Sequence, residues 1–381
     1  METTLTPTLV NKLFAVIRCG LDLESEAPEL TAADSAAILS VGMKQSIQPI
    51  LYRGLKNCGA PKEAVQASDK ARMRHTYLAV QFMEAAKAIG AAFDACGIAY
   101  VLLKGSVIRD LYPAPELRTS SDIDVLVHEE DLDRAVEVLE AQTDFRTLRR
   151  DFHDISMVNS RIHLELHFTL RHNAENIDRL LAKAWDHAAP TGEGSRWAFS
   201  PEYQIFYVTA HMSRHFTNGG LGIRPFIDLW LLRHETQFDE DAVREMCAKC
   251  DILAFYEACC ALSEVWFGGG AHTETTRMLE GFCLSGGVYG SEHFYNAGMQ
   301  RTKRGWHYIA SGVFPPLEEI KGNYPDDSGK DHSAAYYYGK RLASWLGRGK
   351  RAQLKTRMSD ILTTDEAYLD SVGELFKRLG M

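Results

Sequence analysis

The chain has 381 residues, of which 45% are hydrophobic and 24% are charged. This length favours two or three folding units, and this composition is typical of a water-soluble globular protein with a buried core. The formal net charge of −9 argues against non-specific binding of duplex nucleic acid, which relies on basic side chains. No apolar run is long enough to cross a bilayer and the N-terminus lacks the features of a signal peptide, so we expect a cytoplasmic protein without membrane contact.

Residues 1–95 are predicted to form an N-terminal helical region, because apolar residues recur there at spacings of three and four. From Gly97 the pattern changes. The run IAYVLLKG predicts a short strand, which is followed by a tight turn and one or two helical turns. Pro113 and Pro115 then indicate a loop, because proline lacks an amide hydrogen and biases the preceding residue away from helix.

Residues 96–200 are predicted to form a mixed α/β core. IDVLV at 123–127 predicts a second strand, EEDLDRAVEVLEA predicts a helix, and three further strand candidates follow in FRTLRR, DISMVN and RIHLELHFTL. Residues 201–381 are predicted to be helical again, with a loop-rich segment at about 270–332 and closing helices at about 334–346 and 353–378. The expected fold class is therefore α+β, with a small mixed sheet of about four or five strands, helices on one side of it, and helical regions from both ends around it.

Two aspartates at the start of the second predicted strand are the most informative residues. Successive side chains of a strand alternate between its faces, so Asp122 and Asp124 should project to the same side. Two carboxylates in one small volume repel each other unless a cation is present, and Mg²⁺ prefers carboxylate and phosphate oxygens. The pair therefore predicts a site for Mg²⁺ or Mn²⁺.

The same alternation places His163, Glu165 and His167 on one face of the last predicted strand. If this strand lies beside the aspartate strand, Glu165 becomes the third carboxylate of a two-metal site and holds the metal that activates the acceptor hydroxyl. The alternative for Glu165 is a surface acid on an edge strand. The two histidines could orient the carboxylate, line the acceptor pocket, or bind zinc or manganese themselves.

The turn after the first predicted strand offers groups that suit anions. Gly105 and Ser106 could hold the outer phosphates of a nucleoside triphosphate through backbone amides and a hydroxyl at a helix N-terminus. Lys104 and Arg118 could neutralise the charge that gathers on a leaving pyrophosphate. The alternative for Lys104 is a strand end whose ammonium group extends to solvent.

A second cluster lies in the C-terminal region. His211 and His215 are four residues apart, which places both on one face of a helix, and Arg224 and Asp228 follow on the next predicted helix. The simpler interpretation is a helical wall over the nucleotide pocket, with Arg224 near phosphate or paired with Asp228. The alternative is a second metal site, as a metal-dependent phosphohydrolase would need.

These segments resemble the DNA polymerase β-like nucleotidyltransferase superfamily, whose signature is a Gly-Ser turn, an Asp-x-Asp pair and a later carboxylate on a neighbouring strand. More narrowly, LLKGSVIRDLYP, LRTSSDIDVLV and LELHF are similar to a bacterial family of uncharacterised nucleotidyltransferases. The resemblance covers residues 97–170 and extends into the flanks to about 325. The segment from Pro113 to Thr119 departs from the family pattern, because it lengthens the connection between the turn and Asp122.

The resemblance implies a polymerase β-like fold and metal-dependent transfer of a nucleoside monophosphate from a triphosphate, such as ATP, to an acceptor hydroxyl, with release of pyrophosphate. It implies that Asp122, Asp124 and Glu165 bind Mg²⁺ or Mn²⁺, but it does not identify the acceptor, which could be a small molecule or a protein. Two alternatives stay open. One is a non-catalytic nucleotide-binding or partner-binding module on the same fold, and the other is a phosphohydrolase that uses His211 and His215 and releases free phosphate.

Overall fold

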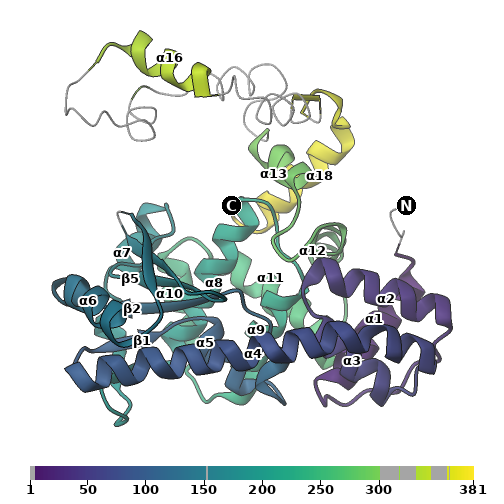
Figure 1. The fold of residues 1–381 in the computed structure, drawn as a ribbon. Coiled ribbons are helices and arrows are strands. Elements are labelled where there is room, and N and C mark those ends of the chain that lie inside the picture. The colour runs from purple at the N-terminus through teal and green to yellow at the C-terminus, as the bar shows by residue number, and fades with distance from the viewer. Residues whose placement is uncertain (1–4, 152, 301–316, 318–331, 345–357, 360) are drawn as a thin grey trace.

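The computed structural model describes residues 5–151, 153–300, 317, 332–344, 358–359 and 361–381. Its N-terminal part is helical, as predicted. Four helices precede the first strand: α1 (Pro7–Gly20), α2 (Ala32–Gln45), α3 (Gln48–Asn57) and α4 (Lys62–Cys96). The 35-residue α4 runs from the other N-terminal helices to the sheet, so it joins the two parts of the molecule (Figure 1).

One mixed sheet follows, in the order β3-β4-β5-β2-β1-β7-β6. Its strands are β1 (Tyr100–Leu102), β2 (Asp122–Val127), β3 (Arg146–Arg150), β4 (Asp154–Val158), β5 (His163–His167), β6 (Ala188–Pro190) and β7 (Arg196–Phe199). β2 pairs in parallel with β5, and β1 pairs in parallel with β7. The sequence predicted about four or five strands. The structure adds the short hairpin β6–β7, whose strands of three and four residues are too short to show an alternating pattern.

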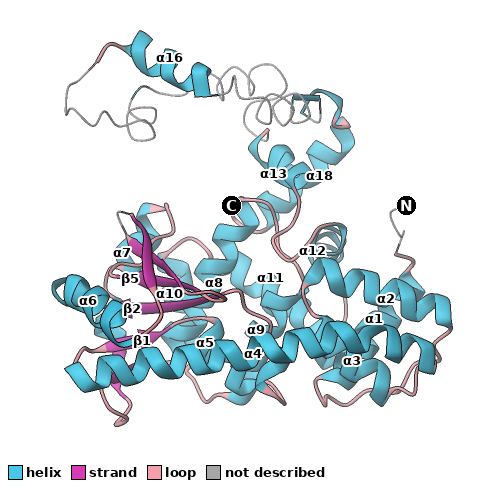
Figure 2. Cartoon of the chain, viewed as in Figure 1, coloured by secondary structure: helices cyan, strands magenta, loops and turns pink. Residues whose placement is uncertain are grey.

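Helices cover both faces of the sheet, which corrects the expectation of helices on one side only (Figure 2). On one face, Ile123 and Val125 of β2 pack in an apolar cluster with α4 and α6 (Leu132–Gln142). On the other face, Leu126 belongs to the larger core that contains α8 (Pro201–Thr217) and α9 (Ile223–Glu235). The second layer arises because Leu126, two residues beyond Asp124, is apolar and needs a partner on the face that carries the aspartates.

The C-terminal region is mainly helical where the structure describes it. Its helices are α8 (Pro201–Thr217), α9 (Ile223–Glu235), α10 (Glu240–Lys249), α11 (Leu253–Ser263), α12 (Glu274–Ser285), α13 (Glu292–Met299), α16 (Ala334–Ser344) and α18 (Glu366–Arg378), and α7 (Glu175–Leu181) precedes this region in the core between β5 and β6. The start of α8 is set by the Ser200 hydroxyl, which accepts from the amide of Tyr203 at 3.3 Å. In the part of the chain that the structure describes, no helix is both long enough and apolar enough to cross a membrane.

The expected loop-rich segment at 270–332 is more helical at its beginning than predicted, because α12 and α13 lie within it. A capping box between Thr273 and Thr276 starts α12 in spite of the glycines that precede it. Residues 301–316 and 318–331 lie outside the described residues. Of the two predicted closing helices, α16 and α18 are present, and residues 353–357 again lie outside.

Candidate active site

The parallel pairing of β2 with β5 brings the predicted acidic residues together. Asp124 is opposite Glu165 in the register, and Asp122 is opposite His163. Residues at the same level of adjacent strands point to the same face of a sheet, so the side chains of Asp124 and Glu165 lie side by side. The two strands are far apart in the sequence but adjacent in the sheet, so their acidic side chains share one face.

His167 completes a compact group with these two carboxylates. Donor atoms of Asp124, Glu165 and His167 all lie within 4.8 Å of one another. His167 Nε2 is 3.1 Å from Asp124 Oδ1 and 3.5 Å from Glu165 Oε2. Two carboxylates and one imidazole could hold a divalent ion, since the oxygens suit Mg²⁺ or Mn²⁺ and the nitrogen suits Mn²⁺ or Zn²⁺.

Asp122 lies on the same face but outside this group. It is partly exposed at the beginning of β2 and accepts a hydrogen bond from the Ser121 hydroxyl at 3.1 Å. His163 lies near Glu165 as predicted, with 4.0 Å between Nδ1 and Oε1, and its Nε2 is 2.7 Å from the Ser156 Oγ of β4. Of the two histidines beside Glu165, His167 therefore has the closer contact with the acidic group.

Electrostatics keep the acidic group ionised. The Lys104 ammonium donates to Asp124 Oδ1 at 2.8 Å, so the half-buried Lys104 is paired with a carboxylate and does not simply extend to solvent. Burial opposes ionisation of Asp124, but attraction to Lys104 and the hydrogen bond from His167 outweigh it and hold the pKa of Asp124 well below its usual range. Burial likewise opposes a charged His167, yet its bonds to Asp124 and Glu165 raise the pKa of His167.

The turn after β1 has an unusual backbone. Lys104 has a φ of 44°, in the left-handed region that favours glycine, and it precedes α5 (Gly105–Ile108), which has four residues. The amide of Ser106 donates to the carbonyl of Leu103 at 3.1 Å, and the Ser106 side chain is buried away from the carboxylates. Ser106 therefore does not present its amide to a phosphate as predicted, because the turn itself uses that donor.

A cleft of about 370 Å³ lies beside the acidic group, and we call it the central cleft. It is lined by the predicted site residues Lys104, Gly105, Arg118, Asp122, Asp124, Glu165, His211, His215, Arg224 and Asp228. Ser106, His163 and His167 do not line it. The sheet forms one wall of the cleft, and α8 and α9 form the opposite wall.

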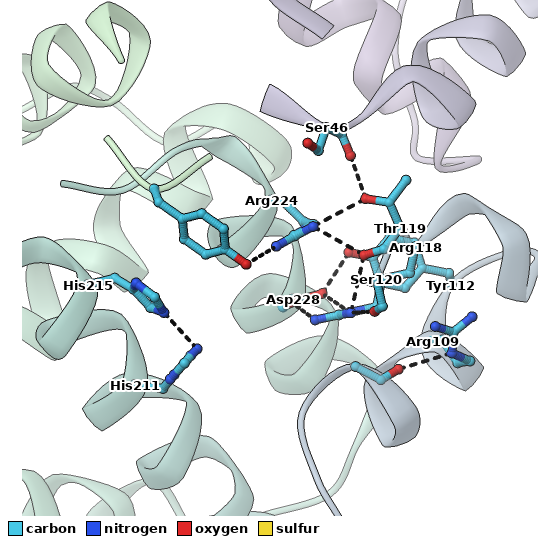
Figure 3. Close-up of polar contacts among 12 residues, drawn as sticks. Ser46, Arg109, Tyr112, Arg118, Thr119, Ser120, His211, His215, Arg224 and Asp228 are labelled. Atoms are coloured by element: carbon cyan, nitrogen blue, oxygen red, sulfur yellow. Dashed lines mark hydrogen bonds and ion pairs between the residues drawn. The ribbon is translucent and has the colours of Figure 1, made fainter. Parts of the chain in front are cut away.

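Two of the predicted cleft residues, Arg118 and Arg224, differ in whether a carboxylate pairs with them. Arg118 Nη2 lies 2.8 Å from Asp228 Oδ2, and the Tyr112 hydroxyl donates to Asp228 Oδ1 at 2.7 Å (Figure 3). Arg224 donates instead to Thr119 at 3.2 Å, and among the described residues it has no carboxylate partner. The sequence left two possible partners for Arg224, a phosphate or Asp228. Arg224 does not pair with Asp228, because Arg118 already forms an ion pair with that carboxylate.

His211 and His215, both on α8, line the wall of the cleft opposite the sheet. Their Nε2 atoms are 3.0 Å apart, so one ring donates to the other (Figure 3). Burial and the nearby positive charge of Lys104 lower the pKa of both, to about 4 for His215. The two rings are therefore neutral near pH 7 and bond to each other. Because Asp228 is paired with Arg118, His211, His215 and Asp228 do not form the set of metal ligands that a phosphohydrolase site would need.

Arg214 and Tyr289 are among the lining residues of the cleft that the predictions did not include. Arg214 lies three residues after His211 on α8, and this helical spacing could have placed it on the same face. Tyr289 comes from the connection between α12 and α13, stacks on His215 with 4.7 Å between ring centroids, and accepts from Arg224 at 3.2 Å. No local sequence signal points to Tyr289, because its place depends on packing of the C-terminal region.

The fold and site define a mixed α+β protein with an acidic cluster that could hold a metal beside a cleft lined by basic residues. The chain belongs to the family described as uncharacterised nucleotidyltransferases, whose model matches residues 31–268. This match includes β1 to β7 and α8 to α11, and it confirms the family suggested by the sequence motifs. No curated protein matches the chain.

Proposed function

We propose that this protein is a metal-dependent nucleotidyltransferase with a polymerase β-like core. It would move a nucleoside monophosphate from a nucleoside triphosphate to an acceptor hydroxyl. The observation that carries the proposal is the matched register of Asp124 and Glu165 on parallel strands, with both carboxylates facing the central cleft. Membership of a nucleotidyltransferase family supports the same reaction class.

The roles follow from where the side chains lie. Asp122, Asp124 and Glu165 would hold the divalent ion, Mg²⁺ or Mn²⁺, with His167 fixing the orientation of two of the carboxylates. When bound, the ion supplies positive charge at the transferring phosphoryl group and favours loss of the acceptor proton. Lys104 and Arg224 line the central cleft and would contact the triphosphate. Arg118 would instead support the wall through its pair with Asp228.

The proposed reaction is a single displacement. The acceptor oxygen forms a bond to the α-phosphorus, and the bond from this phosphorus to the bridging oxygen of the β-phosphate breaks. Pyrophosphate leaves with that electron pair, and the acceptor proton passes to solvent. The contribution of the chain is to position both reactants and to stabilise the charge on the leaving group.

The test is a pair of charge-removing variants. Asp122→Asn and Asp124→Asn should each reduce Mg²⁺-dependent pyrophosphate release to the background rate, because an amide is a poor replacement for a carboxylate on Mg²⁺. Circular dichroism should show an intact fold. The matched control is Asp133→Asn on α6, an exposed carboxylate away from the cleft, which should keep full activity. Turnover that survives both cleft variants would remove the assignment.

One observation favours a second candidate, a non-catalytic nucleotide-binding module. Asp124 Oδ1 already accepts from Lys104 and lies 3.1 Å from His167, so protein cations neutralise this carboxylate by themselves. Thermal shift with ATP, with and without Mg²⁺, followed by a turnover assay separates the two candidates. Stabilisation by ATP without pyrophosphate release across a panel of acceptors would favour the module.

A further inference from the structure

A second cavity of about 280 Å³ adjoins the central cleft, and we call it the side cavity. The two spaces share Lys104, Glu165, His211 and Arg214 as lining residues. Glu165 therefore faces both spaces. A hydroxyl group of a molecule in the side cavity can approach Glu165 while a nucleotide occupies the central cleft.

The walls of the side cavity carry an excess of positive charge. Four basic side chains line it, Lys104, Arg149, Arg171 and Arg214, against the carboxylates of Asp154 and Glu165. Lys104 and Arg149 are paired with Asp124 and Asp151 respectively. By contrast, neither Arg171 nor Arg214 forms an ion pair with any of the described residues.

A hydrogen bond from a side chain to the backbone joins the two unpaired arginines. Arg214 Nη1, on α8, donates to the carbonyl oxygen of Arg171, in the loop after β5, at 3.1 Å. Both residues line the side cavity, although they come from segments 43 residues apart. Two guanidinium groups without carboxylate partners favour a phosphate or a carboxylate, which each can bind through more than one hydrogen bond.

We propose that the side cavity binds the acceptor, and that the acceptor is a small molecule with a hydroxyl group close to an anionic group, a phosphate or a carboxylate, held by Arg171 and Arg214. This inference rests on the proposed function, because it uses Glu165 as the residue beside the attacking hydroxyl. The volume lies just below the range of small-molecule pockets, about 300 to 1,000 Å³, so a compact ligand fits better than a folded protein surface.

The test uses inorganic phosphate as the probe on the full chain. Isothermal titration calorimetry is run with Mg²⁺ and a saturating non-hydrolysable ATP analogue, so that the central cleft is filled. Wild-type protein should still bind phosphate. Arg171→Gln should weaken that binding by about tenfold, the loss expected for one charge-assisted contact, and Arg171→Glu should abolish it. Arg171 is exposed, so both variants should fold.

Arg224→Gln is the matched control, because Arg224 lines the central cleft and not the side cavity. It should weaken binding of the ATP analogue and leave phosphate binding unchanged. If acetate competes with phosphate for the side cavity, the anionic group of the acceptor is a carboxylate. If acetate does not compete, that group is a phosphate. The inference is overturned if phosphate does not bind beside the nucleotide, or if it binds equally well to wild type and Arg171→Gln.

Failure of the proposed function gives a different result. If the protein neither binds the ATP analogue nor releases pyrophosphate, the nucleotidyltransferase assignment fails. Phosphate titration without nucleotide then still compares Arg171→Gln with Arg224→Gln. A loss confined to Arg171→Gln supports an anion site in the side cavity, and a loss confined to Arg224→Gln contradicts it.

Discussion

At the scale of single residues, Gly105 shows how closely the turn after β1 packs. A Cβ atom at this position would overlap the Arg118 guanidinium and the Ser120 hydroxyl. The sequence suggested that this glycine exposes a backbone amide to phosphate. The structure gives it a packing role as well, because the absent side chain allows Arg118 to cross the turn and reach Asp228.

Gly105→Ala should therefore lower the free energy of unfolding by about 1 to 3 kcal/mol, since overpacking forces a buried, paired arginine to move. Urea denaturation measures the change. Gly281→Ala on α12 is the matched control, because a Cβ atom there meets no atom within 4 Å. That control should gain about 0.5 to 1 kcal/mol from its higher helix propensity. Equal effects of the two variants would contradict the close packing at Gly105.

At the scale of elements, α8 places a neutral histidine pair above the acidic face of the sheet. The pKa of His215 is lowered to about 4 by burial and by the charges of Lys104 and Arg214. A histidine with a lowered pKa in the folded state contributes stability that is present above its unfolded pKa of about 6.5 and is lost as pH falls. Protonation of His215 on α8 should therefore destabilise the folded protein as the pH falls.

We expect the free energy of unfolding to fall between about pH 6.5 and pH 4, with a slope of up to about 1.4 kcal/mol per pH unit from His215. Urea unfolding at several pH values in this window measures the slope. The His215→Gln variant should show a shallower slope, because glutamine does not titrate. His172 also has a pKa lowered to about 4 and remains in the variant, so the difference between the two curves reports His215 together with its hydrogen-bonded partner His211. Parallel curves would show that the pKa of His215 is not lowered in the folded state.

At the scale of the whole molecule, Gln45 connects segments that are distant in the sequence. This fully buried residue ends α2, and its amide nitrogen donates to the carbonyls of Cys283 and Gly286 at 3.1 and 2.9 Å. Its oxygen accepts from the amide of Ile223 at the beginning of α9 at 2.8 Å. Next to it, Thr119 donates to the carbonyl of Ser46, so the N-terminal helices also hold the loop that carries Arg118.

Gln45→Ala should cost about 3 kcal/mol or more, because it leaves three buried backbone groups without partners and opens a cavity. Thermal and urea unfolding measure the loss. Gln142→Ala at the exposed end of α6 is the control and should change stability by no more than about 0.5 kcal/mol. A change at Gln45 as small as at Gln142 would mean that the N-terminal helices are not coupled to α9 through this residue.

The sequence by itself determined the local features: the helical regions, the strands that carry Asp122 to Asp124 and His163 to His167, and which side chains share a face within each of these strands. These follow from periods of two and 3.6 residues, which are properties of the backbone within one segment. Only the tertiary structure decided that Arg118 and not Arg224 pairs with Asp228, that His167 joins Asp124, and that Tyr289 reaches the cleft. These contacts depend on which distant segments pack together. Arg118 and Asp228, for example, are 110 positions apart in the sequence, and no local pattern predicts that they meet.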